Sequence, residues 1–107
     1  MPSTKDYLNF VLEQLSGLGE VSFRPMMGEY VLYYHGKVIG GIYDDRFLVK
    51  PTPSALQLLR ESGKEAVYEL PYPGAKNMLM PDIDNRELTC RLVLAIAADL
   101  PAPKKKK

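Results

Sequence analysis

The segment from Glu29 to Pro51 constrains the fold more than any other part of the chain. It holds three runs of apolar and aromatic residues, separated by short polar stretches at His35-Gly36-Lys37 and Asp44-Asp45. Such short polar stretches between β-rich runs are typical of tight turns that join neighbouring antiparallel strands. The segment therefore predicts an antiparallel β-meander, in which Gly40-Gly41 marks a bulge or a close packing contact.

Helical patterns stand on both sides of this meander. Residues 3–19 follow helical spacing, with Ser3 as the predicted N-cap and Asp6 completing a variant of the capping box. After the meander, residues 52–63 predict a short helix, because Thr52 is a natural N-cap and is followed by a proline.

The remainder of the chain predicts two short strands and a last helix. The strands are expected at residues 66–70 and at residues 77–81, the second as an edge strand. The helix is expected from Asp84 onward, with Asp84 and Glu87 as a pair resembling a capping box. This order predicts an α+β domain: an antiparallel β-meander against which N-terminal and C-terminal helices and a short middle helix pack.

The length of 107 residues is sufficient for one hydrophobic core. We expect a single domain over residues 3–100 and a flexible tail rich in proline and lysine over residues 101–107. No apolar run approaches the roughly 20 residues of a membrane span, and the N-terminus lacks the pattern of a signal peptide. Because Cys90 is the single cysteine, it cannot form an internal disulfide, so we expect a soluble, cytoplasmic protein.

The net charge of +1 hides an asymmetry between the body and the end of the chain. Without Lys104, Lys105, Lys106 and Lys107, the rest carries 10 basic and 13 acidic side chains, a net charge of −3. A slightly acidic body argues against direct DNA binding by the fold itself. Two interpretations of the lysines remain open: weak attraction to nucleic acid, or a solubilising end.

No catalytic or metal-binding constellation is present in the sequence. Nucleophilic catalysis needs a base beside a serine or cysteine, but His35 is the only histidine and lies in a predicted turn. Cys90 is expected to pack as a small apolar residue. Zinc sites need clustered Cys and His, so the sequence predicts no metal, no cofactor and no enzyme activity.

Two motifs carry a family resemblance. Arg24–Tyr30, read as Arg-Pro-Met-Met-Gly-Glu-Tyr, is similar to the Arg-x-Met-Phe-Gly-Gly-Tyr signature of the TfoX/Sxy family. Asp44–Lys50 is similar to that family's Asp-x-Arg-Leu-Tyr-Leu-Lys pattern. Over roughly residues 5–100, the chain resembles the N-terminal domain of these regulators, which are associated with natural competence.

The resemblance implies a regulatory or interaction module rather than an enzyme. Two positions depart from the signature, because Met27 stands where the family has Phe and Glu29 where it has the second Gly. Full-length regulators of the family carry a second, C-terminal domain that this chain does not match. A transcriptional role that belongs to that domain is therefore not carried over.

A protein partner is expected at residues of the two motifs: Arg24, Met26, Met27, Gly28, Arg46 and Lys50. In this hypothesis Met26 and Met27 form an adaptable apolar contact and the basic residues set its orientation. We expect residues 20–24 to form a short strand, and the segment shaped by Pro25 and Gly28 to form a loop that enters the first long strand. As an alternative, the basic residues pair with Glu29, Asp44 or Asp45 on neighbouring strands.

Aromatic residues on both faces of the predicted sheet raise a further expectation. Tyr30, Tyr33, Tyr34 and Tyr43 alternate between the faces, so the second face should be covered by a helix or by another copy of the chain. A homodimer is therefore one prediction. The alternative functions are weak nucleic-acid binding through the lysine tail and a local basic patch, and small-molecule binding.

Overall fold

The structure is a computed structural model that describes residues 4–101. Its elements are α1 (Lys5–Gln14), the 3-10 turn η1 (Ser16–Leu18), β1 (Val21–Met26), β2 (Glu29–Tyr34), β3 (Lys37–Ile42), β4 (Phe47–Val49), α2 (Pro53–Glu61), β5 (Tyr68–Glu69), β6 (Met78–Leu79) and α3 (Arg86–Asp99). This arrangement confirms the predicted α+β class. Lys104 to Lys107, with the predicted nucleic-acid contact, lie outside the described residues.

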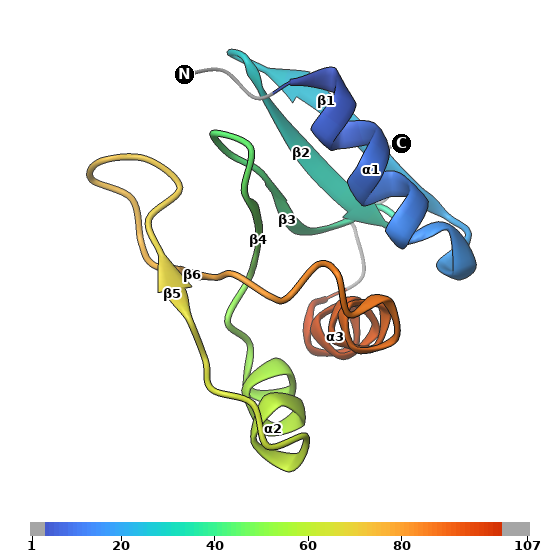
Figure 1. Cartoon of the computed structure of the whole chain (residues 1–107), viewed down its shortest axis with the longest axis vertical. Helices are drawn as coiled ribbons and strands as arrows, with labels where there is room; N and C mark the ends of the chain where they lie inside the picture. The colour runs from blue at the N-terminus through green and yellow to red at the C-terminus, as the bar shows by residue number, and fades with distance from the viewer. Residues whose placement is uncertain (1–3, 102–107) are drawn as a thin grey trace.

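One antiparallel sheet of six strands has the order β1-β2-β3-β4-β6-β5 (Figure 1). The prediction that residues 77–81 form an edge strand is wrong, since β6 pairs with β4 on one side and with β5 on the other. Burial explains the placement: Leu79 of β6 packs in the core, whereas Tyr68 of β5 is exposed. The strand with the buried residue therefore lies inside the sheet, and β5 forms the edge.

Two-residue turns join the first four strands. The residues at Met27-Gly28, His35-Gly36 and Asp44-Asp45 all have positive φ, from 51° to 86°, which defines type I′ turns. At the third turn, the amides of Tyr43 and Arg46 each donate to the other residue's carbonyl, at 2.9 and 3.0 Å. The turns predicted at His35-Gly36 and Asp44-Asp45 are confirmed.

The first of these turns was not predicted. The segment shaped by Pro25 and Gly28 was expected to form a loop, but Pro25 and Met26 extend the predicted short strand as part of β1, and only Met27-Gly28 turns. Pro25 looks like a strand breaker in the sequence. In the fold it lies on the outermost strand, where a missing amide hydrogen need not remove a ladder hydrogen bond.

The hydrophobic core lies on one face of the sheet. All three α-helices contribute to a single buried cluster, together with strand residues such as Leu32, Ile42, Phe47, Val49 and Leu79. Within the described part of the chain, no helix residue belongs to a cluster on the second face. The expectation that a helix covers that face is therefore wrong for residues 4–101.

Two helix caps differ from the prediction. Thr4, not Ser3, caps α1, and its side chain accepts a hydrogen bond from the Tyr7 amide at 3.2 Å; Ser3 lies outside the described residues. Asn85 rather than Asp84 caps α3, through the Leu88 amide at 3.2 Å. In both cases a neighbouring residue that is also of a favoured N-cap type fills the position. The Thr52 cap of α2 is confirmed.

Gly40-Gly41 combines both predicted roles. The pairing of β2 with β3 shifts between Leu32 and Tyr33, so that Ile39 is the extra residue of a bulge beside Gly40. A Cβ atom on Gly40 would lie 2.8 Å from the Cα of Val49 in β4. The strand spacing at this point therefore requires glycine.

No helix in residues 4–101 combines the length and the apolar character needed to cross a membrane.

Candidate functional site

The hairpin tip, defined here as Arg24, Met26, Met27 and Gly28, comprises the end of β1 and the turn that leads to β2. The side chain of Met27 is 99% exposed and that of Met26 is 52% exposed. Arg24 and Gly28 are also exposed. The structure thus answers the question that the sequence left open: both methionines face solvent.

The conformation of Met27 makes its exposure informative. Its φ of 51° lies in the left-handed region, which type I′ turns usually fill with Asn, Asp or Gly. A large apolar side chain at this position gains nothing from burial and adopts a disfavoured backbone conformation. Fold stability therefore does not explain the presence of methionine at the tip.

Strand register places Arg24 on the sheet face that the helices leave uncovered. Arg24 pairs with Val31, Val31 with Gly41, and Gly41 with Leu48, so the four residues form one row across β1 to β4. Lys50 lies two positions beyond Leu48, and strand alternation places it on the same face. Arg24 and Lys50 therefore share a face but stand at the first and fourth strands.

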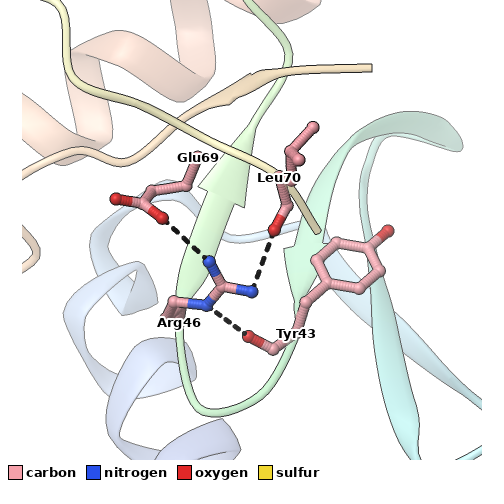
Figure 2. Close-up of polar contacts among 4 residues, drawn as sticks. All are labelled: Tyr43, Arg46, Glu69 and Leu70. Carbon is pink, nitrogen blue, oxygen red and sulfur yellow. Dashed lines mark hydrogen bonds and ion pairs between the residues drawn. The ribbon is translucent and has the colours of Figure 1, made fainter. Parts of the chain in front are cut away.

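The half-buried side chain of Arg46 is held by acceptors from two segments (Figure 2). Its guanidinium donates to the Glu69 carboxylate at 3.1 Å, to the Leu70 carbonyl at 3.0 Å and to the Tyr43 carbonyl at 3.2 Å. The predicted alternative of an ion pair with Glu29, Asp44 or Asp45 is thus wrong for Arg46, whose carboxylate partner is Glu69. A role of Arg46 in partner contact stays a prediction.

The tyrosines divide between the two faces of the sheet. Tyr30 and Tyr34 pack against the core cluster. The Tyr43 ring lies over Gly41, since a Cβ atom on that glycine would come within 2.9 Å of the ring and its hydroxyl. Tyr72 stands near it, with 6.3 Å between the ring centroids. Burial, the neighbouring Tyr72 hydroxyl and Glu29 raise the pKa of Tyr43, which is therefore neutral at physiological pH.

Comparison with known proteins places this geometry in a family. The family model described as the TfoX N-terminal domain matches residues 13–82, a range that contains the hairpin tip, Arg46 and Lys50. This chain belongs to the TfoX N-terminal domain family. It is also similar to an uncharacterized 12.7 kDa protein in the trpE 5′ region of Spirochaeta aurantia, at 36% identity over 109 residues that cover all of this chain and 91% of the relative.

This TfoX N-terminal domain also has a cleft of about 620 Å³ on the core side of the sheet. Its floor comes from three elements, with Phe47 of β4, Leu79 of β6 and Leu92 of α3. Tyr7 of α1 lines the wall, and burial raises the pKa of its hydroxyl despite a hydrogen bond to the backbone of Phe47. Sequence reasoning missed the cleft because its lining comes from segments far apart in the chain. The lining also includes the charged residues Asp45, Arg46, Lys64, Glu65 and Asp82, so the cleft combines apolar and charged surface.

The described part of the domain shows no group of three or more His, Cys, Asp and Glu residues arranged for a metal ion. His35 lies in its turn with its ring edge-on to Tyr34, at a centroid distance of 4.4 Å. The Cys90 thiol donates to the Gln14 carbonyl at 3.4 Å, and burial raises its pKa. A thiol held protonated in this way is a weak nucleophile.

Proposed function

We propose that this TfoX N-terminal domain is a non-enzymatic protein-interaction module that serves regulation in the cytoplasm, and that its contact surface is the hairpin tip. The near-complete exposure of Met27 beside the half-exposed Met26 carries this proposal. Exposed apolar side chains grouped at one point, without a structural reason for their exposure, mark interaction surfaces.

The chemistry of the tip suits a protein partner. Methionine has an unbranched, polarizable side chain that adapts to irregular apolar surfaces. Arg24 lies two residues before Met26 on the same strand face and provides a charged donor that fixes the orientation of a partner. Methionine and arginine are both enriched at protein interfaces.

Arg46 and Lys50 take different parts in this proposal. The three intramolecular acceptors of Arg46 support a positioning role, in which it holds the β5 segment against the start of β4. Lys50, on the same face as Arg24 but at the fourth strand, supports the orientation of a partner that extends across the sheet. Participation in competence regulation rests on the family membership alone.

Capture of partners from the native cell extract tests the proposal. The double variant M26S/M27S should capture less of a specifically bound protein than the wild type, by a factor of about ten or more. Truncating a central contact weakens the free energy of binding by about 2 kcal/mol or more. The matched control is Leu94→Ser, which replaces a 44% exposed leucine of α3, away from the tip.

A photoreactive phenylalanine analogue at position 27 provides a direct second measurement. It should form a crosslink to the captured protein, whereas the same group at position 94 should not. Circular dichroism should show that all variants are folded. Equal capture by the wild type and M26S/M27S, with crosslinks from position 94 instead, would contradict the proposal.

A further inference from the structure

The outer edge of β1 presents backbone groups in a known order. The two-residue turn makes Met26 and Glu29 a hydrogen-bonded pair, so the amides and carbonyls of residues 26, 24 and 22 point toward β2. The His35 amide donates to the Glu20 carbonyl at 3.2 Å, which continues the same alternation. The backbone groups of Val21, Phe23 and Pro25 therefore point away from the sheet.

Only part of this edge can accept another strand. In residues 4–101, β1 is the outermost strand and no other strand pairs with its outer side. Val21 and Phe23 each offer an amide donor and a carbonyl acceptor there, whereas Pro25 has no amide hydrogen. An unpaired edge of this kind is a template for a further strand, and Pro25 limits its usable run.

A groove of about 540 Å³ lies beside this edge. Leu12 of α1 and Leu15, the C-cap residue of that helix, line it on one side, and Val21 and Phe23 line it from β1. Phe23 is 40% exposed, so a large aromatic side chain stands at the mouth of an apolar groove. Glu20, which is exposed and has a φ of 33°, lies directly before β1 and borders the same groove.

We propose that the outer edge of β1 binds the same edge of a second copy of this chain, antiparallel and about a two-fold axis at Ser22. This register pairs Val21 of one copy with Phe23 of the other, so that all four outward amides find carbonyl acceptors. Phe23 of each copy then lies beside Val21 of its partner, whose side chain lines the groove. The pairing goes beyond the proposed function: it shares Arg24 with the hairpin tip but does not require Met26 or Met27 to bind anything.

Charge complementarity favours a second copy in this register. The same two-fold pairing brings Glu20 of each copy, the residue directly before β1, close to Arg24 of the other, which gives two symmetric pairs of opposite charge. Shifting the two-fold axis to Phe23 would place Val21 opposite Pro25, whose missing amide leaves the Val21 carbonyl without a donor. It would also place Arg24 opposite Ser22 and remove the charge pairs.

Sedimentation equilibrium of the full chain tests the pairing. The wild type should associate to a dimer with rising concentration, and Glu20→Arg or Arg24→Glu alone should raise the dissociation constant by about tenfold, because two attractive pairs become repulsive. The double variant E20R/R24E restores opposite charges at both positions and should recover the wild-type constant. Glu13→Arg, an exposed change of equal charge on α1, is the matched control and should leave the constant unchanged.

Amide hydrogen exchange identifies the surface itself. The Val21 and Phe23 amides should become protected as the concentration rises, while the Ser22 and Arg24 amides, already bonded to β2, should not change. A monomer at all concentrations would overturn the proposal. A dimer whose dissociation constant is unchanged by both Glu20→Arg and Arg24→Glu would also overturn it. So would protection of the Val21 and Phe23 amides that occurs only when a different protein is added. M26S/M27S should dimerise normally, so failure of the tip proposal and failure of this one are distinguishable.

Discussion

Gly40 stands at the centre of the sheet, between Leu32 of β2 and Val49 of β4 in one lateral row. The β4 backbone approaches it so closely that a methyl group would contact the Leu48 carbonyl and the Val49 Cα. Neither contact lies at the end of a flexible side chain, so the backbone of β4 would have to move. At the residue scale, close strand packing at this one position depends on the absence of a side chain.

Gly40→Ala should therefore reduce the free energy of unfolding by roughly 3 kcal/mol, the upper part of the range for overpacked positions. Urea denaturation followed by circular dichroism measures the change. Gly17→Ala is the matched control, because no atom lies within 4 Å of the added methyl group. If the unfolding midpoint of Gly40→Ala were the same as that of Gly17→Ala, the spacing of β3 and β4 would adapt to the added methyl group.

The partner of Arg46 illustrates why the site was only partly predictable at this scale. Arg46 was recognised from its motif, but Glu69 lies 23 residues further along the chain, in a strand of two residues. Periodicity carries no information on such a contact. The exposure of Met26 and Met27 likewise depends on where the turn lies, because Met26 ends β1 and Met27 is the first turn residue. The sequence did not indicate this position of the turn.

At the scale of the secondary-structure elements, the two-residue turns of the meander determine how the first four strands pair. Met27→Asn should raise the free energy of unfolding by about 0.5–1 kcal/mol, because Asn tolerates a positive φ far better than Met. The same variant should lose partner capture. Thermal denaturation compares it with Met26→Asn, which places the same residue in the strand and should give no gain. A less stable Met27→Asn variant would mean that the Met27 side chain has a structural role.

Turn chemistry also explains which elements the sequence could predict. His35-Gly36 and Asp44-Asp45 contain residues that favour positive φ, so both turns and the strands between them were correctly predicted. The first hairpin was missed because Met27 is not a typical turn residue and Pro25 resembles a strand breaker. The position of β6 inside the sheet could not be predicted, since a two-residue strand carries no periodic signal.

At the scale of the whole molecule, α2 and α3 share one core with the meander, whereas β5 and β6 join it through a short ladder. A single residue pair, Val49 with Leu79, connects β4 to β6 in the ladder. Arg46 adds two hydrogen bonds, to Glu69 and Leu70, that tie β5 and its following loop to the start of β4, and a third to the Tyr43 carbonyl orients the guanidinium (Figure 2). We infer that this arginine holds the two parts of the sheet in register.

Arg46→Met should accordingly lower global stability by about 1 kcal/mol and loosen the β5–β6 region more than the meander. Amide hydrogen exchange should be faster in residues 68–79 and nearly unchanged in residues 29–42. Arg60→Met, at the exposed end of α2, serves as the control for loss of an arginine. Unchanged exchange in β5 of the Arg46 variant would show that the ladder alone fixes this region.

The three tight turns have a further consequence for the order of folding. Because each joins adjacent strands through two residues, β1 to β4 form a block of low contact order, in which little loop-closure entropy opposes pairing. By contrast, β6 pairs with β4 only after the intervening chain of residues 50–77, which includes α2, has been ordered. We therefore expect the meander to form the folding nucleus, with β5, β6 and α3 docking onto it in a later kinetic step.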